Sequence, residues 1–195
     1  MTDVLDVVKA ELSNRRFDHV LGVVKTAREL AARYSVDGEK AALAAALHDV
    51  YREKTATELR TLANEVDFAV PDDDFATWHG PVTAARLARD FQVLDDEVAE
   101  AIAWHTVGHP EMGRLAQVLY VADTIEPGRV FDGVDDLRVA AALDLSLAVA
   151  VAADASIFYL LEKQSVIAMN TVLLRNQMWR MVDEPMRKDY NQRRT

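Results

Sequence analysis

The chain has 195 residues, half of them hydrophobic, and a formal net charge of −10. A domain of this length buries roughly 70% of the surface that its unfolded chain exposes, so a substantial apolar core is available. The negative charge argues against a duplex nucleic-acid partner, which requires clustered lysine and arginine. The absence of cysteine excludes disulfides, thiolate metal ligands and cysteine nucleophiles. Any bound metal would therefore be held by imidazole and carboxylate groups.

The apolar segments are expected to be too short for a membrane. We find no apolar run of the roughly 18 residues that a transmembrane helix needs. The segment 1–12 carries acidic residues and lacks the basic and then apolar layout of a signal peptide. The sequence therefore predicts a cytoplasmic protein without a membrane partner.

Apolar side chains recur at helical spacing along nearly the whole chain, and no segment shows the sustained two-residue alternation of a strand. A first helix is expected through Leu12. The stretch 41–47 is small and apolar on all sides, so its helix should be central in the fold. Capping residues mark where further helices should begin. These expected starts are Ser13 or Asn14, Asp37-Gly38, and Thr55 with Glu58, the last for a helix to about Val66.

The second half of the chain follows an expected loop at Pro71 and the acidic residues 72–74. Three helices are expected next. The first follows Gly80-Pro81, the second begins at Asp95 or Asp96 and runs through His105, and the third contains Leu115 and reaches Asp123. Two or three further long helices are expected over 135–182. The polar tail 183–195 is expected to fray. We predict an all-α fold with one helical domain over 1–182.

Four of the five histidines lie near expected helix ends or loops and have polar neighbours in the sequence. Imidazole and carboxylate groups suit iron, zinc, manganese or nickel. A lone His-Asp pair arises often by chance, and any one histidine alone is more often structural. An ordered series from separate helices is what a site assembled inside a helical bundle requires. The series here is His19, His48, Asp49, His79, His105 and Asp123.

This order resembles that of HD-domain phosphohydrolases, and the local contexts resemble one branch, the YqeK-type symmetrical diadenosine tetraphosphate hydrolases. Two segments are specific to that branch: His-Thr-x-Gly at 105–108 and Ala-Asp-x-Ile-Glu-Pro-x-Arg at 122–129. Arg175-Asn176 also resembles the end of the family's closing Ala-Arg-Asn. The resemblance spans about residues 14–176 and implies an HD-domain helical bundle.

The resemblance also implies an activity: symmetrical cleavage of diadenosine tetraphosphate to two ADP by metal-activated water. The cofactor would be one or two divalent ions, iron as Fe(II) or Fe(III) first, with Mn, Ni, Zn or Mg as alternatives. A homodimer is a further expectation. The implied metal ligands are His19, His48, Asp49 and Asp123. The implied catalytic residues are Asp49, His79, His105 and Arg129. The implied substrate contacts are Arg52, His79, His105, Thr106, Arg129 and Arg175.

Two positions depart from the family pattern. Arg52 stands where the family often has lysine, and a guanidinium meets phosphate as a planar fork rather than a point charge. Ala168 stands where the family often has histidine, which puts contacts on the nucleobase side in doubt.

Two other functions remain open at this point. The ligand series alone fits an HD phosphohydrolase acting on a deoxynucleotide, an alarmone or a cyclic dinucleotide. A noncatalytic module that binds a nucleotide or a metal is the second alternative, although no ligand of the series is missing.

Overall fold

The computed structural model describes residues 2–71 and 74–194, with side chains from Val4 onward. Within this part of the chain every regular element is helical, which confirms the predicted all-α fold. Residues 72 and 73 of the expected acidic loop lie outside the described residues. The elements are α1 (Thr2–Glu11), α2 (Asn14–Tyr34), α3 (Gly38–Leu47), α4 (Ala56–Asn64), the short 3-10 helix η1 (Phe75–Thr77), α5 (His79–Phe91), α6 (Asp96–Trp104), α7 (Arg114–Ile125), α8 (Val134–Leu143), α9 (Leu145–Glu162), α10 (Met169–Met181) and α11 (Glu184–Arg193).

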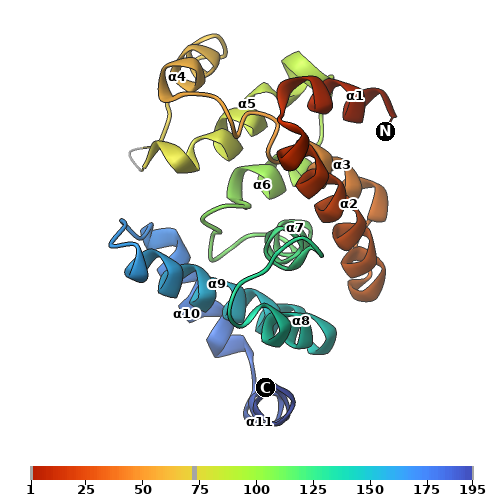
Figure 1. Ribbon diagram of the computed structural model, residues 1–195, viewed down its shortest axis with the longest axis vertical. Helices are drawn as coiled ribbons and strands as arrows, with labels where there is room; N and C mark the ends of the chain where they lie inside the picture. Colours follow the sequence, from red (N-terminus) through yellow and green to blue (C-terminus); the bar gives the residue numbers. More distant parts are fainter. Residues whose placement is uncertain (1, 72–73, 195) are drawn as a thin grey trace.

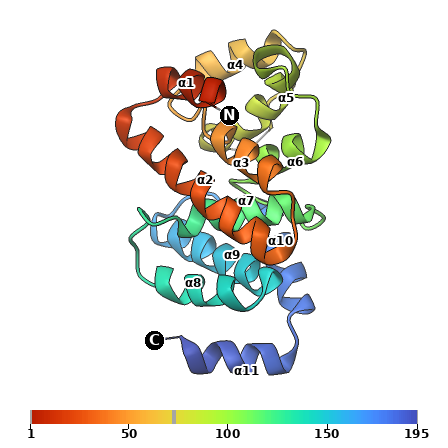
Figure 2. The ribbon, with the colours of Figure 1, turned by 90° about the vertical axis from the view of Figure 1, so that its right-hand side faces the viewer.

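Helix α7 lies in the middle of the bundle and packs against α2, α3, α6, α8 and α9 (Figure 1). Along the long axis, α1, α4 and α5 lie toward one end and α8 to α11 toward the other (Figures 1 and 2). Most of the α7 side chains are buried. A helix that is apolar on nearly every side is stable only when other helices surround it, which explains its place.

The alanine-rich helix α3 is buried along most of its length, as predicted. It packs against α2 and α6. Small side chains let neighbouring helices approach closely while the interior keeps its packing density. As a result, the two residues that follow α3, His48 and Asp49, lie inside the molecule, 0% and 3% exposed.

The predicted helix starts are confirmed where a side chain caps the helix. The Ser13 side chain, rather than that of Asn14, accepts a hydrogen bond from a backbone N–H of α2. Thr55 and Glu58 form the predicted capping box. Asp95, rather than Asp96, caps α6. Each cap satisfies backbone N–H groups that have no partner within the helix.

Three element boundaries differ from the prediction. Helix α4 ends at Asn64 and not at about Val66. Helix α6 ends at Trp104, so His105 is its C-cap residue. Helix α5 begins at His79, one residue before Gly80-Pro81. Pro81 lies within the first turn, where a missing N–H costs no intrahelical hydrogen bond.

The expectation that the tail from Asp183 frays is wrong for the residues described to 194. This segment forms α11, which packs against α8. The Asp183 side chain caps it, and Pro185 lies in its first turn. Although the segment is polar, Tyr190 is only 4% exposed. One buried aromatic side chain and a capped first turn hold a helix that composition alone does not indicate.

The expectation that no apolar run is long enough for a membrane is also wrong, because α9 has 18 residues and a mean hydropathy of 1.7. By length and composition it is the one described helix that could cross a membrane. A core helix passes the same test, so this is a weak indication. Helix α9 packs against α7, α8 and α10. Its Asp154 accepts hydrogen bonds from Arg175 and Trp179 of α10.

Candidate metal centre

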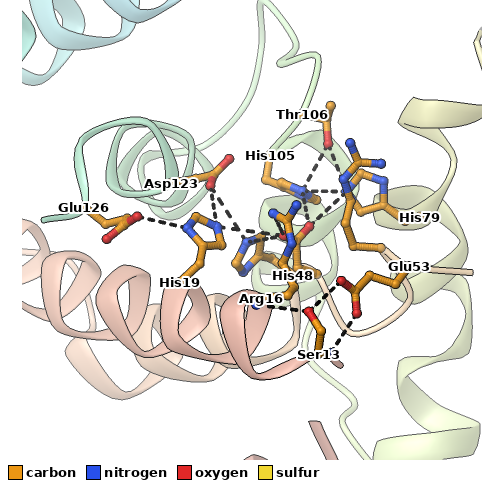
Figure 3. A network of polar contacts seen from close by, with 12 residues as sticks. Ser13, Arg16, His19, His48, Glu53, His79, His105, Thr106, Asp123 and Glu126 are labelled. Atoms are coloured by element: carbon orange, nitrogen blue, oxygen red, sulfur yellow. Dashed lines mark hydrogen bonds and ion pairs between the residues drawn. The ribbon is translucent and has the colours of Figure 1, made fainter. Parts of the chain in front are cut away.

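The fold brings the whole predicted ligand series together, and most of its members stand at helix ends. His48 follows α3, His79 begins α5, and His105 follows α6. These three imidazoles are at most 3% exposed. His19 comes from the second turn of α2, and Asp123 from the last turn of α7. Helices far apart in sequence therefore present donors to one interior region (Figure 3).

Asp49 is shared between two sets of imidazoles. Its Oδ2 atom lies 3.5 Å from His48 Nε2 and 3.8 Å from His19 Nε2. Its Oδ1 atom lies 3.2 Å from His79 Nε2 and 3.6 Å from His105 Nε2. In each set the candidate ligand atoms lie within 4.8 Å of one another. The two carboxylate oxygens thus face two different imidazole pairs.

Three of the imidazoles are oriented by backbone carbonyls three residues earlier in the chain. The Nδ1 atoms of His48, His79 and His105 lie 2.7, 3.1 and 2.7 Å from the carbonyl oxygens three residues earlier. A carbonyl oxygen only accepts, so each Nδ1 must carry the proton and donate. In the neutral ring, the Nε2 atom then holds the free lone pair. That atom is the one that faces Asp49 in all three rings.

The first set has the features of a cation site. Asp123 Oδ1 lies 3.0 Å from His19 Nε2 and 4.0 Å from His48 Nε2. Both Nε2 atoms are buried and make no hydrogen bond. Buried polar atoms nearly always have a partner, and an ion that is not described is one explanation for an exception. Two imidazole nitrogens and two carboxylates fit a divalent metal.

The carboxylates of this site are held in their charged form. Burial alone would raise the pKa of Asp49, but the charge of nearby His48 and the close contacts with His105 and His79 hold that pKa well below its usual value. Burial likewise opposes the charge of Asp123. The close contact with His19 and the nearby guanidinium of Arg129 outweigh it and lower the pKa. Anionic oxygens are what a divalent cation needs as ligands.

His48 and His79 respond differently to burial. Burial lowers the pKa of His48, but the charge of Asp49 outweighs it, so the net shift is upward. For His79, burial dominates, and nearby His105 and Arg52 add to it. The pKa of His79 falls to about 4, although its close contact with Asp49 acts the other way. His79 is therefore neutral at pH 7 and accepts through Nε2.

His79 and His105 face each other with their Nε2 atoms 3.0 Å apart. Each ring donates from Nδ1 to a backbone carbonyl, so in the neutral rings both Nε2 atoms carry lone pairs. Such a pair suits a bound cation or a hydrogen-bond donor between the rings. Thr106 Oγ1 lies 3.0 Å from His105 Nε2 and 3.3 Å from His79 Nε2 (Figure 3). Thr106 thus lies at the site, as the sequence predicted.

Two arginines contact the carboxylates. Arg129 donates from Nη2 to Asp123 Oδ1 at 2.6 Å and from Nε to the Asp123 carbonyl at 2.8 Å. Arg16, which the sequence analysis did not select, donates from Nη1 to Asp49 Oδ2 at 3.0 Å. A signal for Arg16 existed, because it precedes His19 by three residues and so shares its face of α2.

A cavity of about 1090 Å³ opens beside the centre. Its walls include His105, Thr106, Asp123, Arg52 and Arg129 near the centre. Farther away it reaches α9, α10 and α11, where its lining residues include Tyr159, Trp179 and Arg194. Pockets for drug-sized ligands span roughly 300–1,000 Å³, so this cavity suits a large ligand.

Two of the predicted substrate contacts, His79 and Arg175, do not line this cavity, although His79 contacts Thr106, which does. Arg175 is engaged in contacts between helices. Its Nε atom donates to Asp154 Oδ1 at 2.6 Å, and its Nη1 atom donates to Asn176. The guanidinium therefore ties α10 to α9. A second residue that the sequence analysis did not select is Glu126, which binds His19 Nδ1 at 3.1 Å.

A helical bundle with a buried cluster of histidines and aspartates at the foot of a large cavity is the arrangement of a metal-dependent phosphohydrolase. The chain belongs to the HD domain family, whose model matches residues 16–128. The match covers α2 to α7 and therefore all six members of the ligand series. Helices α8 to α11 follow it.

The relatives point to one branch of this family. The chain is 35% identical over 176 residues to a symmetrical bis(5'-nucleosyl)-tetraphosphatase of Bacillus subtilis, covering 89% of this chain and 95% of the relative. A protein of the same name from Halalkalibacterium halodurans is 35% identical over 178 residues, covering 89% of this chain and 94% of the relative. The resemblance predicted from the sequence is confirmed.

A solved structure shows the same fold. It is a crystal structure from Clostridium acetobutylicum described as a predicted HD superfamily hydrolase involved in NAD metabolism. The TM-score is 0.86 at 32% identity, and the match covers 93% of this chain and 97% of that chain. The likeness thus includes the C-terminal helices beyond residue 128 for the most part.

Proposed function

We propose that the protein is a metal-dependent hydrolase that cleaves diadenosine tetraphosphate symmetrically to two ADP. The observation that carries this proposal is Asp49, whose two oxygens face two imidazole pairs beside a cavity of about 1090 Å³. The names of the relatives support the substrate. A nucleotide substrate is also consistent with a negatively charged chain, because the cations are concentrated locally at the site.

The donors His19, His48, Asp49 and Asp123 would hold one divalent ion, and iron is the first choice. Manganese, nickel, zinc and magnesium are the alternatives for this set of nitrogen and oxygen donors. A bound ion of this kind lowers the pKa of its water from 15.7 to about 7 and so supplies a nucleophile at neutral pH. Four donors complete this first set. The second set has only His79 and His105 besides the shared Asp49, so we propose that it serves the phosphates and binds a second ion more weakly.

The remaining residues position the phosphates. Arg129 and Arg52 line the cavity and would neutralise negative charge that develops on phosphate oxygens. His79 and His105 would face the phosphates, with the Thr106 hydroxyl beside both Nε2 atoms as a hydrogen-bond donor. Hydrolysis forms a bond from the water oxygen to phosphorus and breaks the central anhydride, leaving two ADP. The chain mainly needs to hold the phosphates in line, because ADP is a good leaving group.

We further propose a cellular location, an oligomeric state and a domain organisation for the enzyme. A cytoplasmic location without a duplex nucleic-acid or membrane partner is supported by the net charge of −10 and by the packing of α9 against three helices. A homodimer rests on the family resemblance. Helices α8 and α9 pack against α7 and contribute residues to the cavity wall. We therefore propose one domain over 1–182, with residues 183–195 as a C-terminal extension.

Product analysis tests the proposed activity. Protein prepared without oxygen and loaded with iron is incubated with diadenosine tetraphosphate, and the nucleotides are separated by chromatography. We expect ADP as the sole product, and none from an Asp49→Ala protein that keeps its helical content. AMP together with ATP would contradict the symmetrical cut. Turnover of a deoxynucleotide, an alarmone or a cyclic dinucleotide in its place would favour the first alternative function. Metal binding without turnover of any of them would favour the noncatalytic module.

A further inference from the structure

His19 is oriented differently from the other three imidazoles of the centre. They donate from Nδ1 to backbone carbonyls three residues earlier in the chain. His19 lies within α2, where the carbonyls are already engaged in helical hydrogen bonds. Its Nδ1 atom instead lies 3.1 Å from Glu126 Oε1, a carboxylate from the end of α7 (Figure 3). The orientation of His19 therefore depends on a residue 107 positions away.

Glu126 is itself held in place. Its side chain is 5% exposed, so rotation into solvent is not available. The backbone N–H of Gly128 donates to its Oε2 atom at 2.6 Å. Arg138 of α8 donates to its carbonyl oxygen at 3.2 Å. With one oxygen bound to Gly128, the other remains for His19.

Two glycines make room for this carboxylate. A Cβ atom at Gly22 of α2 would lie 2.5 Å from Glu126 Oε2. A Cβ atom at Gly128 would lie 2.9 Å from Glu126 Oε1. A glycine inside a helix costs about 1 kcal/mol relative to alanine. The fold accepts that cost at Gly22, where any side chain would displace the carboxylate.

We propose that Glu126, held between Gly22 and Gly128, is a positioning residue that fixes His19 for metal binding. A carboxylate at Nδ1 requires the proton there and leaves the lone pair on Nε2. His19 Nε2 is the buried atom without a hydrogen bond that lies 3.0 Å from Asp123 Oδ1. A carboxylate partner also makes the opposite nitrogen a stronger ligand. Loss of such a partner typically weakens metal affinity 10–100-fold.

The test measures metal binding and needs no substrate. The metal-free protein is titrated with Mn²⁺ alone, and free Mn²⁺ is followed by electron paramagnetic resonance. We expect the Kd to rise 10–100-fold in Glu126→Ala and to a similar extent in Gly22→Ala, which displaces the carboxylate without removing it. Glu29→Gln is the matched control, because it removes one negative charge from an exposed position of α2. Its Kd should stay within twofold of the wild-type value.

A second readout separates positioning from folding. Nitrogen-15 chemical shifts of His19 report which ring nitrogen carries the proton. We expect the proton on Nδ1 in the wild type and a mixture of both forms in Glu126→Ala. Folded variants that keep the wild-type Kd and the wild-type His19 shifts would overturn the proposal. If Glu126→Ala does not fold, Gly22→Ala decides the question by the same two readouts. The inference rests on the proposed metal site and not on the substrate, so failure to hydrolyse diadenosine tetraphosphate would leave it standing.

Discussion

Arg16 Nη1 lies 3.0 Å from Asp49 Oδ2, the oxygen that also faces His19 and His48. The Arg16 side chain is 30% exposed, whereas that of Asp49 is 5% exposed. The guanidinium therefore reaches from the rim of the site to its most buried carboxylate. A planar guanidinium has five N–H donors, and the structure uses one of them on Asp49. The others remain available to a phosphate.

Replacement of Arg16 by alanine should impair the enzyme more than it impairs metal binding. We expect kcat/KM for diadenosine tetraphosphate to fall 10–100-fold, because a charge-assisted contact to phosphate is lost. The Kd for Mn²⁺ should not rise, since a competing cation at Asp49 is removed. Steady-state kinetics and a Mn²⁺ titration check the two expectations. Arg15→Ala is the control, because it removes the same charge from an exposed neighbour. Equal losses in both variants would indicate a general charge effect.

Variants of the first and second imidazole sets should differ in how much metal they retain. His48→Gln should lose the tightly bound ion, because His48 Nε2 is a buried donor of the first set. His79→Gln should keep one ion per chain and lose turnover, because it removes an imidazole of the second set that faces the phosphates beside His105. Metal analysis after gel filtration, with circular dichroism as the folding control, measures this. Loss of all metal from a folded His79→Gln protein would show that the sets do not act separately.

Arg86 gives a prediction for stability. Its side chain is 6% exposed and forms a bidentate pair with Asp90 at 2.6 and 2.9 Å. It also donates to the Leu62 carbonyl at 2.7 Å and to Glu65, which ties α4 to α5. Arg86→Ala should lower the free energy of unfolding by about 1–3 kcal/mol, because the partly buried Asp90 carboxylate and the Leu62 carbonyl each lose a donor.

The control for Arg86 lies one turn away on the same helix. The Arg89 side chain is 51% exposed, and its ion pair with Glu65 faces solvent. Arg89→Ala should cost about 0–1 kcal/mol. Urea unfolding of both variants distinguishes the two environments. A similar small loss for Arg86→Ala would mean that its network contributes little to the link between α4 and α5.

The sequence predicted most of what depends on local pattern. Thr55 and Glu58 mark a helix start because their hydrogen bonds close within four residues. The ligand series could be predicted because its members recur in a fixed order. Tyr190 shows the limit: the tail around it is polar, and its burial depends on how α11 packs against α8. No periodicity within 183–195 indicates that contact.

The supporting residues of the site were harder to predict for the same reason. Glu126 lies within the quoted segment 122–129, but its partner His19 is on another helix. Gly22 gave no turn signal, because its role is to leave space for a side chain from α7. Such pairings depend on how α2 packs against α7. Only the structure supplies that geometry.

Protonation of His79 should lower the free energy of unfolding of the metal-free protein as the pH falls. The pKa of His79 is about 4 in the folded chain, whereas an unfolded histidine titrates near 6.5. Between these values the unfolded state binds more protons than the folded state, so the free energy of unfolding falls as pH falls. The contribution of His79 is complete above pH 6.5 and is lost progressively down to about pH 4. One pKa unit corresponds to about 1.4 kcal/mol.

Urea unfolding at pH 7 and pH 5 tests this coupling. From pH 7 to pH 5 the metal-free wild type should lose about 2 kcal/mol more than His79→Gln loses, since the glutamine does not titrate. Comparing the two proteins largely cancels the other titrating groups, including His48, whose raised pKa acts in the opposite direction. Equal losses in the two proteins would contradict a neutral, buried His79.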